Sequence, residues 1–174
     1  METRWRRLKK LTGPEILKAA ETAIASQDRE AASFYWTELH RRARRKHVLG
    51  LERRLQQANL PQVPWIDTAA RVVRTFRRRT KGAHYLYFVL LGGYGRSGTE
   101  YGIYVGESAH APDVRYAQHK AGIRDSGVVR RRGVQLLKSV GSHLNPLSRE
   151  EAKRLEREIA TALADNGIRV EGGH

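Results

Sequence analysis

Residues 83–120, AHYLYFVLLGGYGRSGTEYGIYVGESAHAPDVRYAQHK, decide how the chain is expected to fold. The segment 85–91 is aromatic and aliphatic throughout, a composition that favours a buried strand. The glycine-rich residues 92–98 predict a turn, and residues 101–105 predict a second strand that stops at the next glycine. Two such strands are most simply an antiparallel pair with a long hairpin loop, and a short helix follows them.

The rest of the second half predicts one more strand and one more helix. Residues 127–132 are basic and are expected to be irregular, whereas the short apolar segment 134–140 favours a third strand. Ser148 followed by Glu151 is typical of a capping box that starts a final helix, which we expect to end near Ala164. The predicted fold class is therefore α+β, with a small three-stranded antiparallel sheet flanked by helices.

Charge is unevenly spread along the chain. Its 174 residues include 33 Lys and Arg against 18 Asp and Glu, which gives a net charge of +15. Residues 1–81 carry 20 basic and 8 acidic side chains, and residues 82–174 carry 13 and 10, so their net charges are +12 and +3. A chain this cationic is expected to bind a polyanion, and nucleic acid is the usual one.

The basic part and the strand-forming part are expected to be separate domains. Residues 1–81 predict a helical arm or subdomain, and residues 82–174 predict the domain that contains the sheet, with the boundary at Lys81-Gly82 where composition and periodicity change. In the arm, apolar residues recur at helical spacing in three segments. Their starts are expected near Pro14, Asp28 and Asp67, and the second is expected to continue to about His47.

Two groups of arginines are expected to form cationic ridges on these helices. Their spacing of three and four residues places side chains on one face of a helix. The groups are Arg71, Arg74 and Arg78 on the third helix, and Arg41, Arg44 and Arg45 on the second. Such ridges suit contacts with a phosphate backbone, because each neutralised phosphate releases counterions. A solvated basic face is the alternative for either ridge.

Composition excludes several classes of protein. The chain has no cysteine, so disulfides, thiolate metal sites and a thiol nucleophile are excluded. It has no run of 18 apolar residues, and its basic first residues are not followed by the hydrophobic segment of a secretory signal. We therefore expect a cytoplasmic protein without a membrane partner.

One acidic residue of the final helix falls on the apolar face. On a helical wheel, Glu156 projects between Ile159 and Ala160, inside the arc that also holds Leu155 and Leu163. A carboxylate on a buried face is costly unless a cation satisfies it, and a metal ion would do so. The alternative is a glutamate at the helix edge with its tip in water or paired with an arginine.

Taken in order, several of these residues resemble the core of the GIY-YIG nuclease family. Tyr85-Leu86-Tyr87 lies on the first strand and Tyr104-Val105-Gly106 ends the second. Arg115 and His119 follow on a helix, and 155–159 (LEREI) resembles the segment in which the family places its metal-binding glutamate. The resemblance covers residues 82–174 and implies an endonuclease that uses one Mg²⁺ or Mn²⁺ ion.

The resemblance also implies a role for each residue. Arg115 would grip the phosphate and stabilise the charge of the transition state, and His119 would relay a proton or orient the attacking water. We favour Tyr104 as the base or water-positioning group and Tyr87 as its partner, although family members differ over which tyrosine acts. Gly106 would let the backbone turn beneath the phosphate, which makes it a nucleic-acid contact.

The resemblance also implies a metal ligand, and the sequence predicts which residues of the Arg115 helix face inward. Glu156 would hold the metal ion. On the Arg115 helix, the inward residues are expected to be Val114, Ala117 and Ala121. Glu107 stands where many relatives have a lysine, a glutamine or a small polar residue, and Ile168 stands where many have an asparagine.

The sequence therefore predicts a metal-dependent endonuclease that acts on DNA, with RNA not excluded as a substrate. Type II restriction is the preferred role, and a structure-selective repair or mobile-element nuclease is the alternative. One such site cuts one strand, so cutting both strands requires a homodimer or rebinding. The first glycine of the family motif and the later asparagine are missing, and a catalytically inactive nucleic-acid-binding module on the same scaffold is a further alternative. A basic structural protein is the most remote one.

Overall fold

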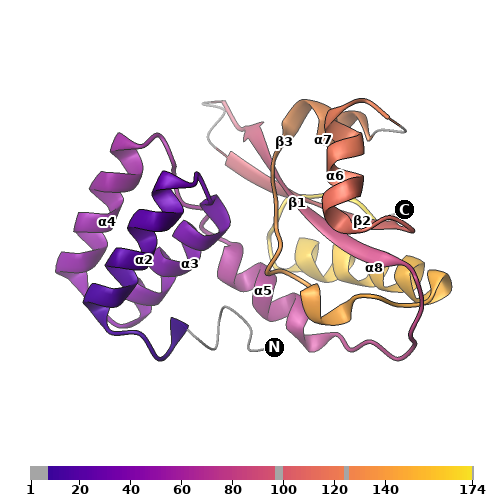
Figure 1. The fold of residues 1–174 in the computed structure, drawn as a ribbon, viewed down its shortest axis with the longest axis horizontal. Coiled ribbons are helices and arrows are strands. Elements are labelled where there is room, and N and C mark those ends of the chain that lie inside the picture. Colours follow the sequence, from indigo (N-terminus) through magenta and orange to yellow (C-terminus); the bar gives the residue numbers. More distant parts are fainter. Residues whose placement is uncertain (1–7, 97–99, 124–125, 174) are drawn as a thin grey trace. The chain divides into compact units, whose positions relative to one another are not determined.

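The computed structural model describes residues 8–96, 100–123 and 126–173. The chain forms two compact units, residues 1–67 and residues 68–174. This division lies before the expected boundary at Lys81-Gly82, so residues 68–81 are grouped with the sheet. Figure 1 shows the helices and strands in sequence colours. No helix in the described part of the chain is long and apolar enough to cross a membrane.

In the described residues, the first unit contains the helices α2 (Gly13–Ala25), α3 (Arg29–Arg41) and α4 (Arg45–Gln57). The expected cap at Asp28 is confirmed, because its side chain accepts the N–H of Ala31 at 3.0 Å. The apolar stripes of the helices meet in one core, whose largest fully buried side chains include Ile16, Leu39, Leu51 and Leu55. Helix α5 (Ile66–Thr75) crosses the division between the units.

The prediction of one long second helix was wrong. Helix α3 ends at Arg41, and the chain turns at Ala43 with a φ of 52° before α4 begins. The turn allows the apolar residues of α4 to reach the same core as those of α3, which a straight helix would not permit. Glu38, fully buried, holds Arg41 and Arg42 at 2.6 Å each and neutralises charge at the end of α3.

The second unit contains a four-stranded mixed sheet in the order β3-β1-β2-β4. Strand β1 (Tyr85–Tyr94) pairs antiparallel with β2 (Glu100–Ser108) and with β3 (Gly133–Leu136). The α+β class and these antiparallel pairs agree with the sequence, but the prediction of three strands was wrong. A three-residue strand, β4 (Val170–Gly172), adds to β2 in parallel after the last helix. So short a strand has no periodicity to detect, and its place depends on pairing with β2.

Helices cover both faces of this sheet (Figure 1). Helices α6 (Pro112–Lys120) and α7 (Gly127–Arg132) pack on the face that carries Tyr87, Val89 and Leu91. Residues 127–132, expected to be irregular, are thus helical, because burial of Val129 against the sheet stabilises this turn. Helix α8 (Arg149–Asp165) packs on the other face, and the 3-10 turn η1 (Ser142–Leu144) precedes it.

The start of α8 is fastened to the segment before the sheet through Glu151. Ser148 caps the helix as expected, since its hydroxyl accepts the N–H of Glu151. In a capping box the Glu151 side chain would accept the main-chain N–H of Ser148, and in this helix it does not. It accepts the N–H groups of Arg79 and Thr80 at 2.7 Å each, together with the Thr80 hydroxyl. The main-chain N–H groups of Arg79 and Thr80 lie outside any strand or helix and need other partners. The Glu151 carboxylate supplies these hydrogen bonds.

We expect Glu151→Gln to lower the free energy of unfolding by about 1–3 kcal/mol at neutral pH, because the charge-assisted hydrogen bonds are weakened. Burial raises the pKa of the Glu151 carboxyl, but hydrogen bonds from Thr80 and Arg79 outweigh burial, so its pKa lies below the usual 4.5. The charged form therefore stabilises the folded state above that pH, and the contribution is lost as the pH falls through the folded pKa.

Denaturant unfolding as a function of pH measures this. The variant and the wild type should converge in acid. The matched control is Glu150→Gln, at an exposed position of the same helical turn. Equal losses in the two variants, or a loss that does not depend on pH, would contradict the role given to Glu151.

Candidate functional site

The antiparallel pairing of β1 with β2 brings two tyrosines onto one face of the sheet. Tyr87 pairs with Gly106, and Val89 pairs with Tyr104, so the two phenols are diagonal neighbours. Their ring centroids lie 5.8 Å apart. The sequence-based expectation that they lie side by side is therefore met in the fold.

Gly106 is needed because both rings lie against it. A Cβ atom at this position would lie 2.6 Å from Cζ and Oη of Tyr87 and 2.7 Å from Cε1 of Tyr104. These distances are shorter than any normal contact, and the obstructing atoms are stiff aromatic rings. The glycine thus allows two large side chains to occupy the space above one strand position.

Tyr87 is hydrogen-bonded to the buried imidazole of His119. The Tyr87 Oη and His119 Nε2 atoms are 2.8 Å apart, and His119 is only 1% exposed. The N–H of Ser126 donates to His119 Nδ1 at 2.8 Å, so Nδ1 carries no proton. In the neutral ring the proton is then on Nε2, which donates to the Tyr87 oxygen. His119 therefore orients Tyr87 and is not open to solvent.

This arrangement corrects the expected inner face of α6. Val114, Ala117 and Ala121 are exposed, whereas His119 is buried and Arg115 is half-buried. The helix turns its Arg115/His119 face to the sheet because the phenols and the Ser126 N–H provide polar partners there. Apolar periodicity alone could not reveal those partners.

Burial also determines the protonation of Tyr87. Burial of the phenol and its contact with Tyr104 raise the pKa of Tyr87 well above its usual value, and Arg115 only partly opposes this shift. Tyr87 is consequently a neutral phenol at physiological pH. It can donate or accept a hydrogen bond but cannot serve as a base, which leaves Tyr104, half-buried on β2, as the tyrosine available to a ligand.

Arg115 lies between the tyrosines and a hollow at the end of β2. Its Nη1 donates to the Gln118 side chain at 3.2 Å, and its charge acts on Tyr87. The hollow has a volume of about 400 Å³ and is bordered by the end of β2, the loop after it and α6. Its lining residues are Glu107, Ser108, Ala109, His110, Arg115, Gln118 and Ile123.

Glu156 approaches this region from the opposite face of the sheet. It is 8% exposed on α8, as the helical wheel predicted, and its carboxyl accepts hydrogen bonds from the N–H groups of Gly173 and Glu107. Burial and the neighbouring charge of Glu107 raise the pKa of Glu156 to about 7. Glu156 is not among the described residues that line the hollow, but its neighbour Glu107 lines it together with Arg115. The expected meeting of Glu156 with Arg115 and the two tyrosines therefore stays a prediction.

Glu107 is the site residue that the sequence analysis missed. Its Oε2 atom lies 2.9 Å from Nδ1 of His84, the residue before β1. The sequence signal for Glu107 was its position directly after Gly106. That position was interpreted only as a departure from the family pattern. Its importance comes from the fold, which brings α8 beneath the end of β2.

The two carboxylates have the chemistry of a divalent-cation site. Among the residues that the structure describes, no group of three His, Cys, Asp or Glu is arranged to hold a metal ion. Mg²⁺, however, commonly uses one or two carboxylates and completes its shell with water and substrate phosphates. Glu156, buried beside Glu107, is costly as an anion, and a cation would relieve that cost, so this donor set fits such an ion.

The arginines expected to share one face of the second helix do not lie on a single helix. Arg41 ends α3 and is paired with Glu38, although more than half of its side chain is exposed. Arg44 and Arg45 are exposed at the start of α4. Because the chain turns between α3 and α4, these three residues do not form a ridge on one helix, and that prediction was wrong.

The other expected ridge is shorter than predicted. Arg71 and Arg74 lie on α5, where Arg71 donates to the Thr68 hydroxyl and Arg74 to the carbonyl of Ala70. Helix α5 ends before Arg78, whose guanidinium donates to the carbonyls of residues 145 and 146 at 3.2 and 3.0 Å. Arg78 therefore ties the segment before the sheet to the turn before α8.

We expect Gly106→Ala to destabilise the chain by about 1–3 kcal/mol, because the new methyl group must displace the ring of Tyr87 or Tyr104. The matched control is Gly50→Ala on α4, where a Cβ meets nothing within 4 Å and helix propensity improves. Denaturant unfolding and the aromatic NMR signals measure both effects. Unchanged tyrosine signals in Gly106→Ala would contradict the packing of both rings against Gly106.

Comparisons with known proteins yield no relative from which a function is inferred. No protein-family model matches the chain. No curated protein and no solved structure matches it either. The arrangement of the side chains is therefore the basis for inferring a function.

Proposed function

We propose that the chain is a divalent-cation-dependent endonuclease that hydrolyses phosphodiester bonds in DNA. The observation that carries the proposal is the gathering of Arg115, Glu107 and a tyrosine pair around the end of β2, with Glu156 beside Glu107 on the α8 side of the sheet. The order of these residues along the chain resembles the GIY-YIG nucleases, which supports the same reaction.

In this proposal the scissile phosphate lies in the hollow beside Arg115. The guanidinium is always charged and its planar fork suits two phosphate oxygens, so it binds the substrate and stabilises the extra charge of the transition state. Tyr104 orients the attacking water. Tyr87, kept neutral and held by the Nε2–H of His119, fixes the position of its neighbour and of Arg115.

Glu156 and Glu107 would hold the cation, with His84 orienting Glu107. Bound Mg²⁺ or Mn²⁺ would polarise a phosphate oxygen and stabilise the charge on the leaving oxygen. The role of Glu107 departs from the single glutamate that the sequence analysis expected. Two carboxylates give the ion a more negative site, which suits a divalent cation.

The biological role proposed is type II restriction, and a DNA duplex is the proposed substrate. A single site of this kind cuts one strand, so cutting of both strands requires two copies of the chain or successive binding events. Sequencing the ends produced from a long mixed-sequence duplex tests the role. Repeated termini support restriction, whereas ends clustered at flaps or junctions indicate a structure-selective nuclease instead.

We expect Glu156→Gln to reduce Mg²⁺-dependent nicking of a supercoiled plasmid by at least about 100-fold, because the amide is a poor ligand for the cation. The matched control is Glu158→Gln on the same helix, whose carboxylate is paired with Arg154 at 2.7 Å and should not affect the rate. Equal nicking by wild type and Glu156→Gln, or no nicking by either, would overturn the proposal and leave at most a binding module.

The folding control for this experiment follows from the pKa of Glu156. A pKa of about 7 in the folded chain lies above the usual 4.5, so the wild type loses stability as the pH rises through 7. Without metal, Glu156→Gln should therefore be at least as stable as the wild type at slightly alkaline pH. A loss of nicking is then not a loss of fold.

A further inference from the structure

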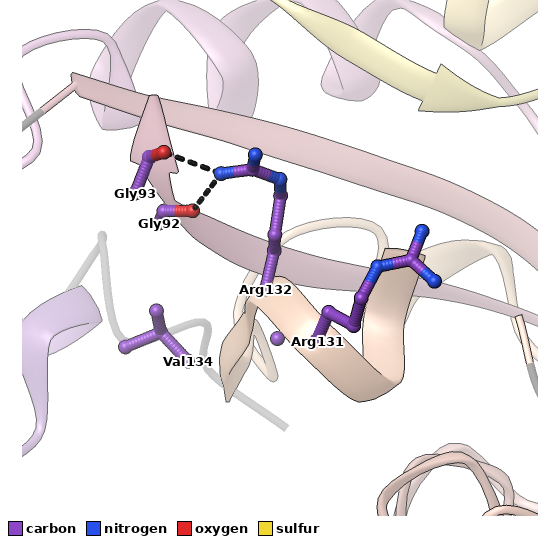
Figure 2. A pocket seen from close by; sticks show the side chains of 6 residues that line it. Gly92, Gly93, Arg131, Arg132 and Val134 are labelled. Carbon is purple, nitrogen blue, oxygen red and sulfur yellow. Dashed lines mark hydrogen bonds between the residues drawn. The ribbon is translucent and has the colours of Figure 1, made fainter. Parts of the chain in front are cut away.

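A second hollow lies at the other end of β1, away from Arg115. It has a volume of about 470 Å³ and lies between the end of β1, the last turn of α7 and the start of β3. Figure 2 shows the residues that line it. They are Gly92, Gly93, Arg131, Arg132, Gly133 and Val134.

Arg132 is held in this hollow by several contacts. Its Nη1 donates to the carbonyls of Gly92 and Gly93, as the dashed lines in Figure 2 show. Its Cζ atom lies 4.5 Å from the centre of the Tyr94 ring, and the guanidinium of Arg169 lies 4.7 Å from the same centre. A guanidinium fixed on one edge and one face presents its remaining N–H groups in a defined direction.

Gly93 is required for the carbonyl contact. Its φ is +78°, a conformation that side chains rarely adopt, and a Cβ there would lie 3.1 Å from Nη1 of Arg132. The left-handed turn thus brings a main-chain carbonyl to the arginine. Arg131, in contrast, is exposed and extends from α7 without reaching these carbonyls (Figure 2).

Positive charge is concentrated here although the second half of the chain has little of it. Residues 130–132 are consecutive arginines, and Lys120 of α6 donates to the carbonyls of Arg130 and Gly133 at 3.3 and 3.0 Å. Among the described lining residues there are two arginines and no acid, and Val134 is the apolar one. Such a hollow suits an anion, and it lacks the apolar walls that enclose a small organic ligand.

The place of this hollow suggests which anion it binds. Helices α6 and α7 pack on the same face of the sheet, so Arg115 and Arg131 belong to one side of the second unit. Glu107 pairs with Leu86, and Gly92 follows six positions later on β1, which is about 20 Å at ~3.4 Å per residue. Two phosphates of one bound duplex can span that separation.

We propose that Arg131 and Arg132 form a second phosphate site, which binds the backbone of the DNA at a distance from the phosphate held by Arg115. This inference rests on the proposed function for the identity of its ligand. The contact positions the duplex and carries no sequence information, as is usual for phosphate contacts. It contributes affinity that depends on salt.

The test measures binding of a fluorescent DNA duplex by anisotropy, at several salt concentrations and with EDTA in place of divalent cations. In Arg131→Ala, affinity should fall and the slope of log affinity against log salt should decrease by about 1, the share of one lost phosphate contact. Arg131→Lys, which keeps the charge, should retain most of the slope.

The matched control is Arg149→Ala, an exposed arginine at the start of α8 on the opposite face of the sheet. It should bind like the wild type. Equal losses in Arg131→Ala and Arg149→Ala would overturn the second phosphate site, and so would wild-type binding that does not respond to salt.

Failure of this inference differs from failure of the proposed nuclease. If Arg131→Ala loses affinity while the wild type never nicks a plasmid with Mg²⁺, the phosphate site is supported and the nuclease activity is not. If the plasmid is nicked and Arg131→Ala binds as well as Arg149→Ala, the nuclease is supported and the second site is wrong.

Discussion

The hydrogen-bonded register between β1 and β2 sets the positions on which the candidate site depends. It places Tyr87 opposite Gly106 and brings Tyr104 in diagonally, so both phenols leave the same face of the sheet. A slip of one residue would turn one phenol to the α8 face, because side chains alternate along a strand. His119 completes the arrangement, since its ring is fixed between the Ser126 N–H and the Tyr87 oxygen.

The ionisable groups of the candidate site come from both faces of the sheet near the end of β2. Arg115 reaches the hollow from α6, and Glu156 approaches from α8 beneath Glu107. Burial, and after it the nearby charge of Glu107, makes the Glu156 anion costly without a cation and raises its pKa. In the proposed hydrolysis, the same cost favours binding of the ion that the reaction requires.

Net charge is a poor guide to where arginines line a hollow in this chain. Residues 1–81 hold most of the excess charge, yet Arg41 and Arg42 are paired with the buried Glu38, and Arg78 is engaged with main-chain carbonyls. The second half has a net charge of only +3, but its arginines line two separate hollows. Local geometry therefore matters more than the sum of charges.

The sequence alone determined what local patterns can express. The two long strands, the helix with Arg115 and His119, the cap at Ser148 and the inward position of Glu156 all follow from periodicity and turn chemistry. It also showed where Pro14 and Asp28 start helices. These features depend on residues close to one another in the chain.

Tertiary structure alone decided the rest, because it depends on contacts between distant residues. Strand β4 forms only because β2 offers an open edge, and α7 forms only because Val129 is buried against the sheet. Polar partners on β1 and in the segment after α6 determine which face of α6 packs on the sheet. The apolar residues of α6 therefore predicted the wrong inner face. Glu156 becomes a neighbour of Glu107 only because α8 packs on β2, a juxtaposition of residues 107 and 156 that no local pattern encodes.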